Sequence, residues 1–184
     1  REPIDFNTKL GMYKQLGFDG VQFHDDDAVP DMADLTPEQI VKKAEALRKK
    51  LEGHGLVAEF TAPRLWEDPR TIDGGYTSND PECRKYAIER SRRAIDIANA
   101  LGTDLLVLWL AREGTYIREA KDSKVSIDLL VDAMNQMLEF DPNIRICIEP
   151  KPNEPPDQTY VPTTGHAIAL GHLTVAPDRV GVNI

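Results

Sequence analysis

One stretch decides how the rest of the chain is interpreted: Ile144-Arg145-Ile146-Cys147-Ile148-Glu149-Pro150-Lys151-Pro152-Asn153-Glu154-Pro155. Its first residues are rich in β-branched side chains and predict a short, buried strand. The strand then ends in a turn with proline at 150, 152 and 155, and each proline fixes φ. Glu149 and Lys151 therefore leave a stiff backbone, as a metal ligand or an electrophile-polarising lysine requires. Taken alone, a surface turn whose charges face water is an equally good interpretation.

Working outward from this stretch, apolar runs that predict strands alternate with helical patterns. The expected strands are 20–23, 56–61, 104–109, 144–148 and 179–184, and the expected helices are 4–16, 36–53, 81–102, 125–140 and 164–173. The spacing of Phe6, Leu10 and Tyr13 places them on one face of the first helix, which stops at Gly17. Such alternation predicts βαβ units and a parallel sheet, which leaves a doubly wound sheet and a partial (β/α) barrel both possible.

The positions of the polar and aromatic candidates favour the barrel. His24, Asp27, Trp109, Glu149 and Lys151 all lie at or just past the carboxyl end of a predicted strand. Barrel enzymes assemble their active sites at that end. In addition, no G-x-G-x-x-G follows the first strand, so a dinucleotide-binding fold gains no support.

Composition narrows the class of protein. A chain of 184 residues with 41% hydrophobic and 29% charged residues suits one globular domain, and we treat 1–184 as such. A net charge of −9 argues against nucleic acid or an anionic membrane as partner. Cys83 and Cys147 are far apart and suggest a reducing compartment, so we expect a cytoplasmic protein.

His24 and Asp27 form the first candidate site. A carboxylate three residues from a histidine can hold one ring nitrogen, which leaves the other free to exchange a proton with a substrate oxygen. A solvated acidic turn is the stronger interpretation when this segment is taken by itself. His54, His166 and His172 have no such partner nearby in sequence and are interpreted as surface or structural residues.

Five motifs occur in an order that resembles a known family. They are FHDDD at 23–27, DGGYTSND at 73–80, W..REG at 109–114, IEPKPNEP at 148–155 and PT.GHA at 162–167. In order and spacing the chain resembles the D-xylose isomerases of the short actinobacterial type. The resemblance implies a TIM barrel that interconverts D-xylose and D-xylulose, and D-glucose and D-fructose, by metal-assisted hydride shift after ring opening. It also implies two divalent cations (Mg²⁺, Mn²⁺ or Co²⁺) and a homo-oligomer, in that family a tetramer.

The resemblance also implies roles for the polar candidates. His24 would handle the ring-opening proton of the cyclic sugar, and Asp27 would orient it. Glu149, a hard oxygen donor, would bind a metal ion that holds sugar hydroxyls. Lys151 would contact the terminal oxygen of the substrate and stabilise the charge that develops there. Glu154 is left as a structural residue.

Two aromatic residues complete the implied site. Trp109 would form an apolar wall that keeps water from the migrating hydride. An ungapped count back from Asp73 places Trp66 at a second wall position. Leu110-Ala111 and Thr61-Ala62-Pro63 depart from the residues usual in the family, which leaves the shape of the pocket, and hence the preferred sugar, open.

The predicted strands are fewer than a complete barrel of this fold needs. A closed barrel has eight strands and about 250 residues, so we expect a first strand before Arg1 and further strands, with most metal ligands, after Ile184. Residues 1–184 alone are then expected to be inactive, and to oligomerise or to form the core of a longer chain. The alternatives are a non-catalytic piece of such a barrel acting in folding or assembly, or a related epimerase or nuclease.

Overall fold

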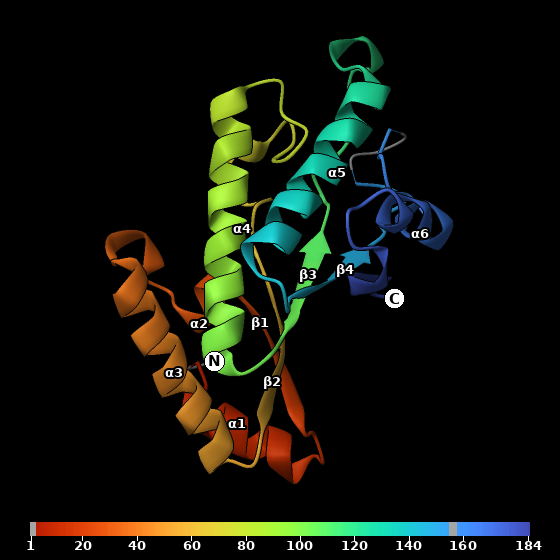
Figure 1. Ribbon diagram of the computed structural model, residues 1–184. Helices are drawn as coiled ribbons and strands as arrows, with labels where there is room; N and C mark the ends of the chain where they lie inside the picture. Colours follow the sequence, from red (N-terminus) through yellow and green to blue (C-terminus); the bar gives the residue numbers. More distant parts are fainter. Residues whose placement is uncertain (1–2, 155–157) are drawn as a thin grey trace.

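A single sheet of five parallel strands organises the molecule, in the order β1-β2-β3-β4-β5 (Figure 1). The computed structural model describes residues 3–154 and 158–184, so the predicted role of Pro155 lies outside the described residues. The strands are β1 (Gly20–His24), β2 (Val57–Ala62), β3 (Leu105–Trp109), β4 (Arg145–Glu149) and β5 (Val180–Val182). The predicted fold class is therefore confirmed: an α/β fold with five parallel strands, as in a partial TIM barrel.

Helices connect each strand to the next. The longer connecting helices are α3 (Pro37–Gly53), α4 (Pro81–Leu101), α5 (Ser123–Phe140) and α6 (Thr164–His172), whereas α1 (Phe6–Gln15) precedes β1. Short helical turns are α2 (Asp25–Ala28), η1 (Met32–Asp34), η2 (Pro69–Thr71), η3 (Arg118–Ala120) and η4 (Pro177–Arg179). Among the described residues, none of these helices has the length and hydropathy needed to cross a membrane.

Local sequence signals explain where α3 and α4 begin and end. Thr36 and Gln39 form the predicted capping box, with each side chain accepting a hydrogen bond from the other residue's backbone N–H. Asp80 caps α4, with Pro81 at its first position. The helix stops at Gly102, whose φ of +85° is a left-handed conformation that glycine adopts without strain.

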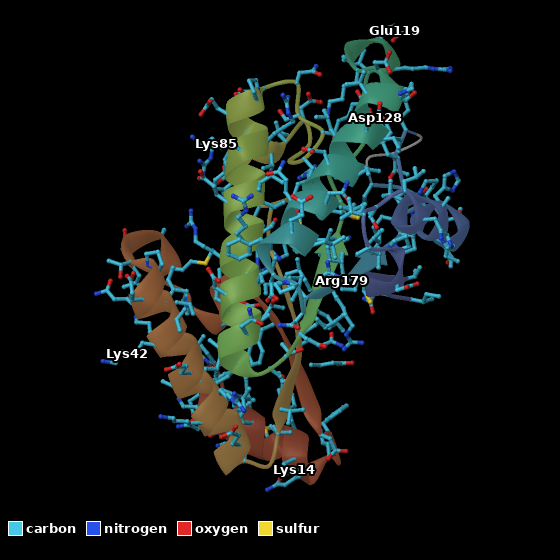
Figure 2. All side chains as sticks on the ribbon, viewed as in Figure 1. Lys14, Lys42, Lys85, Glu119, Asp128 and Arg179 are labelled. Atoms are coloured by element: carbon cyan, nitrogen blue, oxygen red, sulfur yellow. The ribbon has the colours of Figure 1, made fainter. Side chains whose placement is uncertain are left out.

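The helices α3, α4 and α5 pack on one face of the sheet, and Figure 1 shows them in front of the strands. Side chains of β4 show the consequence, because Ile146 and Ile148 are fully buried in a core that also includes residues of α4, α5 and α6. The alternate residues Arg145, Cys147 and Glu149 are more exposed. Lys42, Lys85 and Asp128 project from the outer surface of the helices (Figure 2).

One face of α1 is buried only in part, and one interpretation of a local segment was wrong. On α1 only Leu10 is buried, whereas Phe6 and Tyr13 are 39% and 37% exposed. The helix offers a single apolar anchor, since its other side chains point away from the β1–β2 core. The segment after β1 is not a solvated turn either: it is the short helix α2, and Asp25 within it is completely buried.

Candidate active site

A continuous row of side chains runs along the carboxyl ends of the strands. The His24 ring, at the end of β1, lies 5.1 Å from the Trp66 ring, which comes from the connection after β2. The Trp66 ring lies 4.2 Å from the Trp109 ring at the end of β3, with the planes tilted by 56°. Lys151 Nζ then lies 4.5 Å from the Trp109 ring centroid. Two tryptophans thus separate an imidazole from an ammonium group along one edge of the sheet.

The far end of the row lies where β4 and β5 end. Lys151 Nζ is 3.7 Å from Glu149 Oε1, and Asn183 Nδ2 donates a hydrogen bond of 2.9 Å to Glu149 Oε2. All three residues are partly exposed. The carboxylate therefore has one amide donor and one loosely placed cation, and it keeps capacity to accept further contacts.

The near end of the row is a cluster of charges around His24. His24 Nδ1 lies 3.1 Å from Asp27 Oδ2, so the carboxylate three residues away contacts one ring nitrogen, as expected from the sequence. Arg64, two residues before Trp66, reaches both groups: its Nη2 lies 2.6 Å from Asp27 Oδ2 and 3.0 Å from His24 Nδ1. The imidazole is thus contacted at the same nitrogen by a carboxylate and by a guanidinium.

Arg64 and α2 are anchored to the barrel wall by a buried carboxylate. Asp25 is fully buried and accepts hydrogen bonds from Arg90 Nε at 2.6 Å and Nη2 at 3.0 Å. It also accepts a hydrogen bond from the Arg64 backbone N–H at 3.0 Å. Asp26 bridges both guanidiniums, at 2.8 Å from Arg64 Nε and 3.3 Å from Arg90 Nη2. Burial with several charge-assisted partners makes this a rigid support for His24.

Glu113, in the connection that follows β3, binds the loop that carries Trp66. Glu113 is 3% exposed, and its carboxylate accepts hydrogen bonds of 2.9–3.0 Å from the backbone N–H groups of Gly75, Tyr76 and Thr77. The Thr77 hydroxyl donates a fourth at 2.6 Å. Two motifs quoted from the sequence, DGGYTSND and W..REG, thereby meet, and the connection after β2 is fixed against the connection after β3.

The buried amine of Lys121 adds to this contact. Its Nζ donates to the backbone carbonyl of Asp73 and, at 3.2 Å, to that of Gly114. It also lies 3.4 Å from the Asp73 carboxylate. Both tryptophans of the row belong to segments tied together in this way, so their mutual distance is set by the fold.

The residues described do not by themselves form a site for a divalent cation. No group of three histidine, cysteine, aspartate or glutamate side chains is suitably arranged within residues 3–154 and 158–184. Among the described residues, Glu149 is the one carboxylate at its end of the row, whereas Mg²⁺ and related ions take about six oxygen ligands. Glu149 could therefore contribute one ligand to such an ion, but it could not hold the ion alone.

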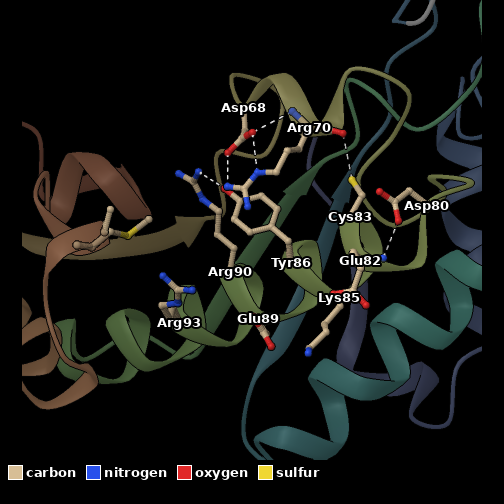
Figure 3. A pocket seen from close by; sticks show the side chains of 12 residues that line it. Asp68, Arg70, Asp80, Glu82, Cys83, Lys85, Tyr86, Glu89, Arg90 and Arg93 are labelled. Carbon is tan, nitrogen blue, oxygen red and sulfur yellow. Dashed lines mark hydrogen bonds and ion pairs between the residues drawn. The ribbon is translucent and has the colours of Figure 1, made fainter.

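A cavity among the described residues lies away from this row. It has a volume of about 670 Å³ and lies beside the amino-terminal half of α4 and the loop carrying Asp68 (Figure 3). Two charges of its lining are paired with each other: Arg70 Nη2 lies 2.6 Å from Asp68 Oδ2, and the Arg70 guanidinium stacks 3.6 Å from the centroid of Tyr86. The residues that the sequence indicated lie in the row at the strand ends, and this row is therefore the candidate active site.

Sequence reasoning missed three residues that the structure brings to the row. Arg64 gave no signal, because its contacts with Asp27 and His24 span about 40 positions of the chain. Glu113 was part of a quoted motif but had no assigned role. Asn183 follows β5 directly, which was a usable signal, since the other candidates follow strands in the same way.

The remaining histidines lie outside the row. The ring of His166 is 2.8 Å from the hydroxyl of Thr163, the residue that caps α6. His54 and His172 lie at the carboxyl ends of α3 and α6. Glu154 is exposed.

Solved structures with the same fold include several enzymes named for sugars. D-psicose 3-epimerase from Clostridium cellulolyticum H10, solved with D-tagatose, is 15% identical over 98% of this chain and 57% of its own, with a TM-score of 0.69. The family 2 AP endonuclease from Brucella melitensis is 16% identical over 98% of this chain and 63% of its own, with a TM-score of 0.68. A magnesium complex of a xylose isomerase-like TIM barrel protein from Mycobacterium smegmatis is 19% identical over 97% of this chain and 55% of its own, with a TM-score of 0.56.

At these identities the likeness establishes the fold alone. The chain spans 55–63% of the length of these three proteins, so the activity and substrates of the whole protein are matters for proposal. The family is settled by its own model, which matches residues 11–184. This chain belongs to the xylose isomerase-like TIM barrel family.

Proposed function

We propose that this chain supplies part of the active site of a sugar aldose–ketose isomerase, with D-xylose and D-xylulose as its natural pair. D-glucose and D-fructose would be weaker substrates. The observation that carries the proposal is the row from His24 through Trp66 and Trp109 to Lys151. It combines a proton-exchanging group, an apolar wall and a fixed positive charge at the end of the sheet where barrel enzymes act.

Each component matches a requirement of the reaction. An aldose becomes a ketose when a hydride moves from C2 to C1 and a proton moves from the C2 hydroxyl to the C1 oxygen. Negative charge builds on the C1 oxygen as the hydride arrives, and the Lys151 ammonium, when placed beside that oxygen, stabilises it. The adjoining tryptophan rings exclude water from the path of the hydride.

His24 acts earlier, on the cyclic sugar. Its imidazole is partly exposed, and Nε2 is the nitrogen not engaged by Asp27 or Arg64. Proton exchange between this nitrogen and a sugar oxygen is the role that the resemblance gives to His24. Asp27 then orients the ring through Nδ1.

The proposal includes a requirement for Mg²⁺, Mn²⁺ or Co²⁺ in the whole protein. The support is the carboxylate of Glu149 at a strand end and the family to which the chain belongs. Since Glu149 alone cannot hold such an ion, the other ligands would have to come from outside the described residues.

The test is product analysis with the purified whole protein, not with residues 1–184 alone. D-xylose and MgCl₂ should yield D-xylulose, and exhaustive EDTA treatment should abolish the conversion until Mg²⁺, Mn²⁺ or Co²⁺ is restored. Full activity after EDTA would contradict the metal requirement. If the protein converts a ketose to its 3-epimer and does not interconvert aldose and ketose, it is an epimerase. If it does neither, the proposal is wrong and the non-catalytic alternative is favoured.

A further inference from the structure

The contact between Arg64 and the His24–Asp27 pair determines how the imidazole is protonated. Arg64 Nη2, His24 Nδ1 and Asp27 Oδ2 form a triangle with sides of 2.6, 3.0 and 3.1 Å. The arginine comes from the connection after β2, and the other two residues come from the end of β1 and from α2.

Donors and acceptors at Nδ1 cannot all be satisfied at once in a neutral ring. A carboxylate only accepts hydrogen bonds, so a bond between His24 and Asp27 requires a proton on Nδ1. A guanidinium only donates, so a bond between Arg64 and His24 requires a lone pair on Nδ1. Nη2 carries two hydrogens and can donate one to each partner, whereas the single Nδ1 position cannot both donate and accept.

Several hydrogen bonds hold the Arg64 guanidinium beside His24 Nδ1. Its side chain is 18% exposed, and its Nε donates to Asp26 at 2.8 Å while Nη1 lies 3.3 Å from Glu67. Its backbone N–H is bound by the fully buried Asp25. Asp27, by contrast, is 55% exposed and has no comparable set of anchors in the described chain.

We propose that Arg64 is a positioning residue that keeps the proton of neutral His24 on Nε2. In this tautomer Nδ1 accepts from Arg64, Asp27 accepts from Arg64, and the Nε2–H faces outward as a hydrogen-bond donor. The ligand it suits is a sugar oxygen with a free lone pair, such as the ring oxygen or the carbonyl oxygen of the open chain. This inference rests on the proposed function for its ligand, but not for the tautomer itself.

The tautomer has a direct consequence for ring opening. Removal of a hydroxyl proton by Nε2 requires that nitrogen to start without a proton, and then Nδ1 must carry one. His24 can therefore act as a base only after Nδ1 exchanges Arg64 for Asp27 as its partner. Arg64 thus holds the site in a state that binds sugar oxygens and delays proton removal.

The experiment is ¹⁵N NMR of the imidazole nitrogens in the purified protein without substrate, at a pH where the ring is neutral. His24→Gln identifies the His24 signals among the four histidines. The wild type should show the proton on Nε2, and Arg64→Met, which has no atom at the Nη2 position, should move it to Nδ1. Asp27→Ala is the matched control, because it removes the competing partner and should leave the proton on Nε2.

A wild-type proton on Nδ1 would overturn the inference, as would an Arg64→Met spectrum unchanged from wild type. If Arg64→Met does not fold, Arg64→Gln replaces it, since it keeps a polar group for Asp26 but also lacks Nη2, with the same two outcomes. The spectra are read without sugar, so they stand whether or not the protein isomerises xylose. Failure of the proposed function would appear separately, as absence of ketose in the product assay.

Discussion

At the β1 end of the candidate active site, His24 and Asp27 contact Arg64, whose backbone N–H is bound by the fully buried Asp25. Asp25 also accepts hydrogen bonds from Arg90. At the β4 end, Lys151 has only Glu149 at 3.7 Å and the face of Trp109 at 4.5 Å as partners among the described residues. One end is fixed by charge-assisted hydrogen bonds inside the fold, and the other presents an ammonium group with few competing contacts.

Because of this difference, we expect the β1 end to affect mainly the stability of the fold and the β4 end to affect mainly the rate of the reaction. Substitutions at the β1 end remove partners from buried charges and should lower the free energy of unfolding. Substitutions at the β4 end disturb little packing and should act on the reaction instead. Trp66 and Trp109 lie between the two ends, and we expect substitutions at the two ends to have nearly additive effects, as is usual for separated sites.

The largest effect on folding is expected from Asp25→Asn. The substitution weakens the pair with Arg90, which is itself only 11% exposed, and should cost about 3 kcal/mol of unfolding free energy. Urea unfolding followed by tryptophan fluorescence measures it. The control is Asp104→Asn, whose bidentate pair with Arg145 is more than half exposed on both sides and should cost less than about 1 kcal/mol. If the two substitutions lowered the free energy of unfolding equally, the buried pair of Asp25 and Arg90 would be no more important for stability than an exposed ion pair, which would contradict the prediction.

Lys151→Met should have the next largest effect, on rate. Loss of a fixed donor to a developing oxyanion typically lowers kcat by about 10²–10³-fold. The unfolding midpoint should stay within error of the wild type, because the ammonium has no short hydrogen bond within the described residues. Steady-state kinetics with D-xylose and a urea titration test both halves. A variant with wild-type kcat would show that the role given to Lys151 is wrong.

A smaller effect concerns acid stability in the loop that carries Trp66. Hydrogen bonds from the Arg70 guanidinium lower the pKa of the Asp68 carboxyl well below its usual range. A lowered folded-state pKa contributes stability above the unfolded pKa of about 3.9, and that contribution is lost as pH falls below it. Because Arg70 is 59% exposed, solvent screening keeps the contribution near about 1 kcal/mol.

Asp68→Asn should therefore be less stable than the wild type at neutral pH, and the difference should shrink as pH drops from about 4 towards 2. Urea unfolding at a series of pH values measures this. A difference that stays constant across that range would mean that Asp68 contributes by packing and not by its charge.

The strands were predictable from the sequence because each one is a short run of apolar residues that can be recognised without knowledge of its partners. The apolar runs that predicted strands at 104–109 and 144–148 became β3 and β4 within one residue. On α1, Leu10 is buried whereas Phe6 and Tyr13 are partly exposed, since apolar spacing says which residues share a face but not whether a core meets that face. Position at a strand end also indicated most of the row, since the carboxyl ends of parallel strands meet at one edge.

The supports of the site were not predictable in the same way. Glu113 binds the backbone of residues 75–77, and any sequence could supply those N–H groups. Arg64 depends on a loop geometry that no periodicity encodes, yet it contacts the nitrogen that decides how His24 is protonated. Partners recruited through the backbone or across long loops leave no pattern in the sequence.

The central claim is that the row from His24 to Lys151 forms one sugar site in which a hydride moves while water is excluded. Isomerisation of D-xylose in D₂O, with the product examined by NMR, tests it most directly. A hydride shift behind the wall of Trp66 and Trp109 predicts D-xylulose with no solvent deuterium bound to C1. Deuterium on that carbon would mean that the hydrogen passed through solvent as a proton, and would contradict the account.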